Sequence, residues 1–222
     1  DGQQTTLLGM MQQAISNQGD AWHLFRKMVK KHLDIFLEKS QTDKPPEIPE
    51  PDEYTFSLVD KMALRTAQLH MALARDKTTT DFAPEEFSLE FQSQLLESVT
   101  NLLDDKIQLL KNNIDKLSEL QRSRVKAIIS HRDQISQHFA TLLKQPLAAK
   151  KTRIHGDYHL GQLLFTGDDF TIIDFEGEPD TPSRLRRLKY SPLRDVAGII
   201  RSFHYAAYSI SVSYTHLRAH ET

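Results

Sequence analysis

Apolar residues recur every three or four positions over three long stretches of the chain, which is the period of a helix that buries one face. These stretches are 21–38, 54–75 and 88–146. Asp20 is placed to cap the first helix, and the proline-rich segment 40–52 predicts a stiff, extended connector to the second. The third stretch is longer than an ordinary helix and holds Asn112 and Asn113 near its middle. We therefore expect two antiparallel helices there.

Short apolar runs separated by turn residues replace this pattern from residue 150 onward. None of the eight glycines lies between Asp20 and His155, whereas four lie within 156–177. Because glycine marks turns and close backbone approaches, we expect the functional loops in this region. The expected strands are 152–154, 162–165 and 170–174, and a last helix is expected over 191–210.

Composition narrows the classes of protein to consider. The 222 residues include no cysteine, which excludes a disulfide scaffold, a thiolate metal site and a cysteine nucleophile. The 28 basic and 30 acidic side chains leave a net charge of −2, which argues against nucleic acid as a partner. With no apolar run long enough for a membrane span and no secretory leader, we expect a soluble cytoplasmic protein that binds no membrane.

Two neighbouring segments, 155–162 and 172–179, hold the candidate chemistry. The first reads His-Gly-Asp, then four residues, then Gln162, and the second contains Asp-Phe-Glu-Gly starting at Asp174. A kinase has the same order: a catalytic loop with His-Arg-Asp, four residues and Asn, followed by Asp-Phe-Gly. The spacing therefore predicts phosphoryl transfer.

Each of these residues suits one part of that reaction. Asp157 can align an acceptor hydroxyl and remove its proton as the catalytic base. Mg²⁺ prefers oxygen ligands, which the amide of Gln162 and the carboxylate of Asp174 can supply. Glu176 is a candidate for a further ligand or for a supporting position behind the metal.

Five further residues are candidates for substrate contact or for support of the loop. His155 and His159 are expected to hold the loop by hydrogen bonds, with His159 near the substrate; a transition-metal site is the alternative. Tyr158 either faces the substrate or packs in the core. Arg194 and Asp195 are expected to form an ion pair that braces the catalytic loop, with direct substrate contact as the alternative.

Two other features have a plain structural interpretation and a functional one. The basic run Arg184, Arg186, Arg187 and Lys189 is expected to be a solvated loop, with phosphate or partner contact as the alternative. Trp22 is expected to be a core residue, with stacking on a sugar or nucleotide as the alternative.

Several segments together resemble the maltokinase family, which belongs to the small-molecule kinases related to aminoglycoside phosphotransferases. The resemblance runs from about Thr5 to about Ile210 and is most specific around Asp157 and Asp174. The segments are His-Gly-Asp-Tyr-His-Leu-Gly-Gln-Leu-Leu at 155–164, Ile-Asp-Phe-Glu-Gly-Glu-Pro at 173–179, Ser-Pro-Leu-Arg-Asp-Val-Ala-Gly at 191–198, Asn-Gln-Gly-Asp-Ala-Trp at 17–22, Leu-Arg-Thr-Ala-Gln-Leu-His at 64–70 and Phe-Ala-Pro at 82–84.

The resemblance implies that ATP and maltose react to ADP and maltose 1-phosphate, an entry to α-glucan (glycogen) synthesis. It implies ATP and Mg²⁺ as cofactors, Asp157 as the base, Gln162 and Asp174 as metal ligands, and a possible fused trehalose synthase domain. The nucleotide hinge then falls at Gln13, Ala14 and Ile15. A kinase of another sugar, of an aminoglycoside or of choline is one alternative. A non-catalytic, kinase-derived helical binding module is another.

The expected fold class is α+β, mainly α: the C-terminal lobe of a protein-kinase-like fold, with small β-hairpins that carry the catalytic and metal loops. Residues 1–20 are expected to be the end of the N-terminal lobe and the hinge, and residues 21–211 the helical C-terminal lobe, with catalytic loops at 152–179. Since no glycine-rich phosphate loop precedes the hinge, we expect most of the N-terminal lobe to be missing and the chain alone to be inactive. The tail 212–222 resembles a translated sequencing adapter, and we expect it to be unrelated to the helix before it.

Overall fold

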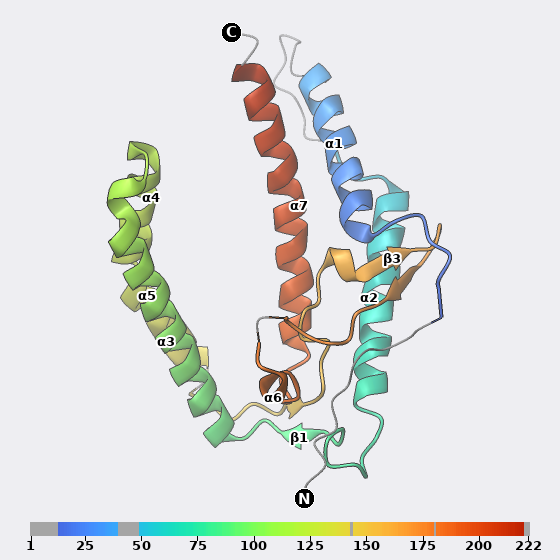
Figure 1. Ribbon diagram of the computed structural model, residues 1–222, viewed down its shortest axis with the longest axis vertical. Helices are drawn as coiled ribbons and strands as arrows, with labels where there is room; N and C mark the ends of the chain where they lie inside the picture. Colours follow the sequence, from blue (N-terminus) through green and yellow to red (C-terminus); the bar gives the residue numbers. More distant parts are fainter. Residues whose placement is uncertain (1–12, 40–48, 143, 180, 220–222) are drawn as a thin grey trace, which may run out of the picture. The chain divides into compact units, whose positions relative to one another are not determined.

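The computed structural model describes residues 13–39, 49–142, 144–179 and 181–219 (Figure 1). These residues fall into two compact units. The first unit comprises the described residues within 1–75, 153–188 and 192–222, and the second comprises those within 76–152 and 189–191. Among the helices of the described residues, none combines the length and the apolar character that a membrane crossing needs.

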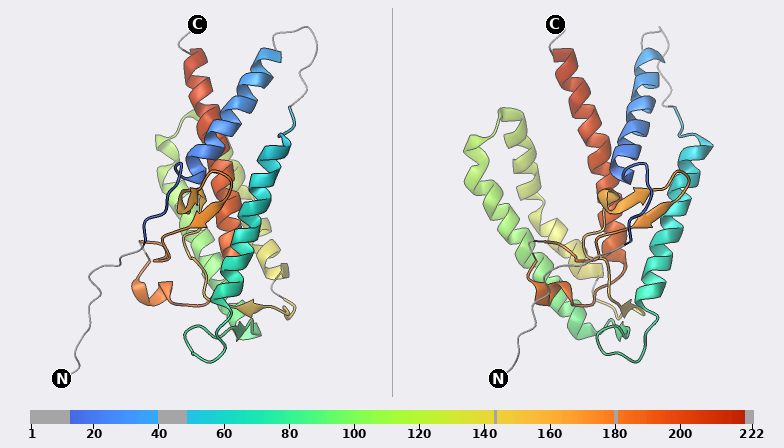
Figure 2. Two further views of the ribbon diagram at one scale, coloured as in Figure 1. Left: turned by 90° about the vertical axis from the view of Figure 1, so that its right-hand side faces the viewer. Right: turned by 45° about the vertical axis from the view of Figure 1, so that its right-hand side comes forward.

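Three long helices and one small hairpin build the first unit. The helices are α1 (Ala21–Lys39), α2 (Glu53–Leu73) and α7 (Leu193–Ala219), with a short α6 (Ser183–Arg186). The hairpin is made of β3 (Leu163–Phe165) and β4 (Phe170–Ile172), which pair antiparallel and follow the 3₁₀ turn η2 (Leu160–Gln162). Helix α1 packs along α7, while β3 contacts α1 and β4 contacts α2 (Figure 2). The hairpin thus lies between two helices, with the segment 155–162, the predicted catalytic loop, at its start.

The core of the first unit forms where α1, α2, α7 and the hairpin meet. Phe25 of α1 lies edge-to-face on Phe203 of α7, with ring centroids 4.8 Å apart. Helix α7 contributes residues spaced three or four apart, as expected for one buried stripe. The buried cluster consists of Ala21, Phe25, Leu58, Met62, Tyr158, Leu160, Leu163, Phe165, Phe170, Ile199 and Ala206.

The second unit is a helical hairpin on a two-stranded ribbon. Its elements are β1 (Glu85–Glu86), α3 (Leu89–Asn113), the 3₁₀ turn η1 (Ile114–Lys116), α4 (Glu119–Ser130), α5 (Arg132–Leu142) and β2 (Lys150–Lys151). Strands β1 and β2 pair antiparallel. Helix α3 packs against both α4 and α5.

The helical pattern of the sequence is confirmed for α1, α2 and the break at Asn113. Asp20 caps α1 as expected, since its Oδ1 accepts the amide hydrogen of His23 at 2.8 Å. The second half of the long stretch is two helices instead of one: α4 ends at Ser130, and α5 begins at Arg132. Helix α7 runs on to Ala219, so the expected break before residue 212 is not seen in the backbone.

The expected strand at 152–154 is wrong. The strand there is β2, two residues earlier, and its partner β1 has no apolar alternation that could have predicted it. Most of the proline-rich connector and most of 1–20 lie outside the described residues. The proposed hinge residues Gln13, Ala14 and Ile15 are in irregular backbone just before a segment that runs beside β3.

Candidate active site

Asp195, in the first turn of α7, holds the start of the catalytic loop. Its carboxylate accepts the amide hydrogens of His155 at 2.8 Å and Gly156 at 3.0 Å. It also pairs with Nε2 of His70 on α2 at 2.9 Å. Burial on its own would raise the pKa of Asp195, but these hydrogen bonds outweigh it and hold the pKa below its usual value. Asp195 thus braces the loop as expected, and the side chain that bonds to its carboxylate is His70, where an ion pair with Arg194 was expected.

The same face of α7 holds the rest of the loop at two later positions. Ser202 Oγ accepts the amide hydrogen of Leu160 at 3.1 Å. At Gly198, an added Cβ would lie 2.6 Å from the carbonyl oxygen of Tyr158, so the helix can approach the loop only because this residue is glycine. Three positions on one helix therefore fix the backbone on both sides of Asp157.

His155 connects the catalytic loop to the segment that carries Asp174. The ring is buried; Nδ1 accepts the amide hydrogen of Asp157 at 3.4 Å, and Nε2 faces the carbonyl oxygen of Ile173 at 2.8 Å. Since Nδ1 is an acceptor, Nε2 carries the proton and donates it to Ile173. The expected role of His155 in loop support is thus explained by a neutral ring with both nitrogens in use.

Gln162 and Asp174 are brought together from the two segments. Nε2 of Gln162 donates to Oδ2 of Asp174 at 2.9 Å, and the amide of Ile173 donates to the carbonyl of Gln162 at 3.0 Å. Asp174 has φ of 62°, a left-handed conformation that is uncommon for a residue other than glycine. Strained backbone of this kind is concentrated at functional sites.

The donor set at this pair fits Mg²⁺. One carboxylate and one amide oxygen are hard ligands, and Mg²⁺ in phosphoryl-transfer sites takes few protein ligands, with water and phosphate oxygens as the rest. Both ring nitrogens of His155 are already used in hydrogen bonds within the protein, which argues against the His155–His159 transition-metal alternative. Glu176 is exposed, and within the described chain no hydrogen bond joins its carboxylate to Gln162 or Asp174.

Asp157 lies beside His159. The carboxylate Oδ2 is 3.8 Å from Nε2 of His159, and Nδ1 of that ring accepts the amide hydrogen of Gly161 at 3.0 Å. The accepting nitrogen fixes the tautomer, so the ring directs an N–H toward Asp157. The Asp157 side chain is 31% exposed, which leaves it accessible to a substrate.

The side chain of Tyr158 packs in the core of the first unit. Its side chain is buried, and its hydroxyl lies 2.7 Å from Oγ1 of Thr66, which itself donates to the carbonyl of Met62. The tyrosine is therefore the donor in this pair. Burial raises the pKa of Tyr158 despite the bond to Thr66. Packing was one of the two roles that the sequence left open.

A groove of about 1110 Å³ opens beside the catalytic loop in the first unit. Asp157, His159 and Arg194 line it, together with Trp22 at the start of α1. Trp22 also packs against the buried cluster, so the core role expected for it is confirmed while part of the residue borders the groove.

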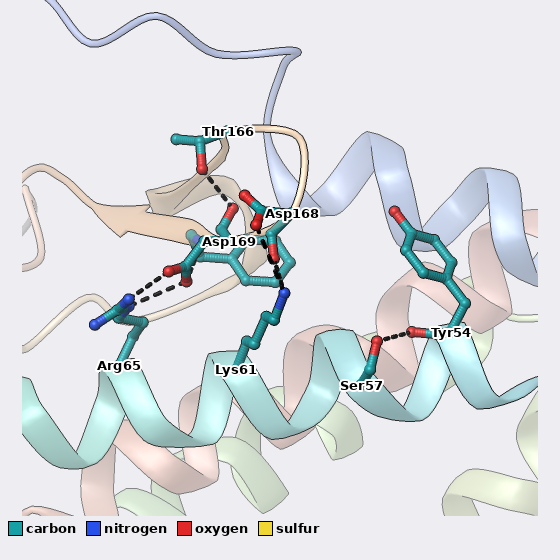
Figure 3. A network of polar contacts seen from close by, with 8 residues as sticks. Tyr54, Ser57, Lys61, Arg65, Thr166, Asp168 and Asp169 are labelled. Carbon is teal, nitrogen blue, oxygen red and sulfur yellow. Dashed lines mark hydrogen bonds and ion pairs between the residues drawn. The ribbon is translucent and has the colours of Figure 1, made fainter.

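The hairpin that follows Gln162 is fastened to α2 at its tip (Figure 3). Arg65 binds Asp169 through both carboxylate oxygens, with Nε to Oδ1 at 3.0 Å. One turn earlier, Lys61 donates to the carbonyl oxygen of Asp168 at 2.5 Å. Within the tip, Thr166 Oγ1 donates to the carbonyl of Asp169 at 3.1 Å. These contacts fix the strands whose opposite ends carry Gln162 and Asp174.

Sequence reasoning missed several supporting residues. His70 appeared only as part of the helical stretch 54–75 and of the maltokinase-like segment 64–70, and Ser202 gave no signal. The basic run is not simply a solvated loop: Arg186 donates to the carbonyls of Thr181 at 2.6 Å, Glu176 at 3.3 Å and Pro179 at 3.3 Å. In the second unit, Lys189 is buried and binds Glu85 at 2.7 Å and the carbonyl of Thr80 at 2.5 Å.

Comparison with known families adds to this geometry. The profile of the phosphotransferase enzyme family matches residues 40–177, well over half of the chain and both functional segments up to Gly177. The chain belongs to the phosphotransferase enzyme family. The membership confirms the aminoglycoside-phosphotransferase-like kinase relationship inferred from the sequence.

Two curated proteins match shorter parts of the chain. A glucosamine kinase of Mycolicibacterium smegmatis is 36% identical over 63 residues, which is 28% of this chain and 16% of the relative. A glucosamine kinase of Streptacidiphilus jiangxiensis is 35% identical over 49 residues, 22% of this chain and 11% of the relative.

Solved structures show the same fold. A glucosamine kinase in complex with glucosamine, ADP and inorganic phosphate superimposes with a TM-score of 0.62 at 18% identity. The match covers 87% of this chain and 39% of the kinase, so the chain spans about two fifths of the relative's length. A second crystal form of glucosamine kinase gives the same TM-score.

Proposed function

We propose that this chain carries the catalytic and acceptor-binding part of an ATP-dependent sugar kinase. The observation that carries the proposal is the Gln162–Asp174 pair, tied through His155 to the backbone of Asp157. Membership of the phosphotransferase enzyme family supports the reaction class. The retention of all three functional residues argues against a non-catalytic binding module.

The chemistry follows from the residue types. Asp157 accepts the proton of the acceptor hydroxyl as its oxygen bonds to the γ-phosphorus of ATP, and the bond to the departing ADP oxygen breaks. Held by Gln162 and Asp174, Mg²⁺ would neutralise charge on the transferred phosphate. The N–H of His159 faces one oxygen of Asp157 and orients the carboxylate.

The acceptor that we propose is maltose, phosphorylated to maltose 1-phosphate. The support is the maltokinase-like sequence around Asp157, Asp174 and Asp195. Glucosamine is the second candidate, because the matched relatives and solved structures are glucosamine kinases. A fused trehalose synthase partner remains part of the maltose proposal, since it rests on the same resemblance.

The remaining parts of the enzyme also belong to this proposal. The helices and hairpins described above would form a C-terminal lobe, Gln13, Ala14 and Ile15 would border the nucleotide, and a nucleotide-binding lobe would precede them. The partial coverage of the matched kinase supports this division. Arg194, which lines the groove, would contact the sugar, and Glu176 would support the metal.

The test is transfer of the γ-phosphate of ATP to maltose, glucosamine and choline, followed by ³¹P NMR. It uses this chain alone and a longer polypeptide that carries it behind a nucleotide-binding lobe. We expect phosphoryl transfer only in the longer protein, with maltose the best acceptor.

The variant Asp157→Asn should lower the rate by about 10²–10⁴-fold, because it removes the base. Asp60→Asn, on the exposed face of α2, is the matched control and should leave the rate unchanged. An Asp157→Asn enzyme with the wild-type rate would overturn the assignment of the base. A preference for glucosamine would replace maltose as the acceptor and leave the kinase assignment intact.

A further inference from the structure

One face of α7 lines the groove from Arg194 to Val212. Its residues follow one another at intervals of three or four, so they form one stripe along the helix. They are Arg194, Gly198, Arg201, Tyr205, Tyr208 and Val212. The neighbouring stripe, which includes Ile199, Ala206 and Ile210, is buried. The exposed side chains of the stripe lie beside this packed face, while the buried Asp195 and Ser202 also border the groove near the catalytic loop.

Two large aromatic side chains on the groove face remain accessible. Tyr205 is 52% exposed and Tyr208 is 71% exposed, although both line the groove with Asp157. Arg201 donates from Nη2 to the hydroxyl of Tyr205 at 2.9 Å, and its guanidinium lies 5.2 Å from the ring centroid. These two contacts fix the Tyr205 ring in one orientation.

The stripe begins at the catalytic loop and leads away from it. Gly198 touches the carbonyl of Tyr158, next to Asp157, whereas Tyr208 is ten residues further along the helix. At the rise of an α-helix, this separation is about 15 Å. An acceptor that places its reacting hydroxyl at Asp157 reaches the tyrosines only if it continues beyond its first ring.

We propose that Tyr205 and Tyr208 form a second acceptor subsite, which binds the ring of a sugar acceptor that is remote from the reacting hydroxyl. The proposal rests on the sugar-kinase function proposed above and adds the residues that select acceptor length. A tyrosine offers a flat apolar face to the C–H face of a sugar ring and a hydroxyl to its polar edge. Arg201 adds hydrogen-bond donors for sugar hydroxyls.

The groove has the composition of a small-molecule site. Aromatic groups from two helices, Trp22 and the two tyrosines, are interleaved with Asp157, Glu178 and Arg201. Ligand sites combine apolar or aromatic walls with a few polar groups that orient the ligand. The mixture of acidic and basic side chains suits a neutral, hydroxyl-rich ligand better than a polyanion.

The single tryptophan of the chain provides the probe, because Trp22 lines this groove. The fluorescence of the full chain is titrated with glucose, glucosamine, maltose and maltotriose. We expect maltose to bind about tenfold more tightly than glucose, since maltose, unlike glucose, reaches both the catalytic loop and the tyrosines.

Three variants and one control define the site. Tyr205→Ala and Tyr208→Ala should each raise the Kd of maltose about tenfold and leave that of glucose within about twofold. Tyr54→Ala is the matched control, because Tyr54 is 51% exposed on α2 outside the groove, and it should change neither constant. Tyr205→Phe keeps the ring and should retain most of the affinity for maltose. Circular dichroism checks that each variant is folded.

The outcomes separate this subsite from the proposed function. Equal maltose affinity in wild type, Tyr205→Ala and Tyr208→Ala, or no binding of maltose to wild type, overturns the subsite. If sugar phosphorylation that depends on Asp157 is nevertheless observed in the longer protein, the kinase function stands. Maltose binding that depends on the tyrosines, without phosphoryl transfer to any sugar, supports the subsite and overturns the kinase.

Discussion

The carboxylate of Asp195 receives the amide hydrogen of His155 at 2.8 Å, which joins the first turn of α7 to the start of the catalytic loop. The same carboxylate is buried and accepts two further hydrogen bonds, from Gly156 and His70. Buried carboxylates are stable only when they are paired in this way. The contacts between the loop and α7 should therefore contribute to the free energy of unfolding, which can be measured in variants of Asp195.

Replacing Asp195 by Asn should destabilise the protein by about 3 kcal/mol, because the amide cannot satisfy two backbone donors and His70 together. Urea denaturation followed by circular dichroism gives the change in the free energy of unfolding. Asp34→Asn, which removes an exposed pair with Lys30 on α1, is the control and should change it by less than about 0.5 kcal/mol. Equal losses of unfolding free energy in the two variants would contradict a stabilising role of Asp195 at the loop.

Acid should remove the contribution of Asp195. Its pKa is lower in the folded protein than in the unfolded chain, so the stabilisation is present above the unfolded value of about 4 and is lost as the pH falls through the folded value. The difference in unfolding free energy between wild type and Asp195→Asn should therefore narrow below about pH 4. Urea midpoints between pH 7 and pH 3 test this. If the difference in unfolding free energy stays constant from pH 7 to pH 3, the ionised carboxylate of Asp195 is not the source of the stabilisation.

Gly198→Ala should destabilise the protein although alanine is the better helix former. The added Cβ would lie 2.6 Å from the carbonyl oxygen of Tyr158, a backbone atom that cannot move without the loop. We expect a loss of more than about 1 kcal/mol, against a propensity gain of similar size. Ala197→Gly, at an exposed neighbouring position, measures the propensity term alone and should cost about 1 kcal/mol. A Gly198→Ala protein that is more stable than wild type would contradict the close approach.

Arg65 and Asp169 should be coupled in a double-mutant cycle. The two-point contact of this half-exposed pair predicts a coupling energy of about 0.5–1 kcal/mol, lowered by salt. The Lys30–Asp34 pair of α1 makes a single contact and should give about 0.3–0.5 kcal/mol. Denaturation of the single and double alanine variants at low and high salt provides the measurement. No coupling between Arg65 and Asp169 would show that the tip of the hairpin is held by other contacts.

The parts that could be predicted from the sequence are those set by local patterns. Helices α1 and α2 follow from apolar spacing, and the start of α1 also follows from Asp20, whose side chain accepts an amide hydrogen of the first turn. The segments with Asp157 and Asp174 follow from their spacing. Contacts between residues distant in sequence could not be predicted from local patterns. The His70–Asp195 pair is an example, since it depends on how α2 and α7 pack.

The interruption between α4 and α5 had no clear local signal either. The chain there contains no proline or glycine, and the amide of His131 still bonds back to Ala127 and Ile128. Strand β1, with its two glutamates, depends on pairing with lysines of β2 more than 60 residues away in the chain, as with Lys150 and Glu86. Such pairing is set by tertiary structure and not by propensity.

The contacts of Asp195, Gly198 and Ser202 with the loop have a consequence for the thermodynamics of ligand binding. The amides of His155, Gly156 and Leu160 already have partners within the protein, and so do both ring nitrogens of His155. A ligand that arrives at Asp157 therefore meets a backbone whose conformational entropy was lost during folding. Little of its binding enthalpy is then offset by ordering of the loop.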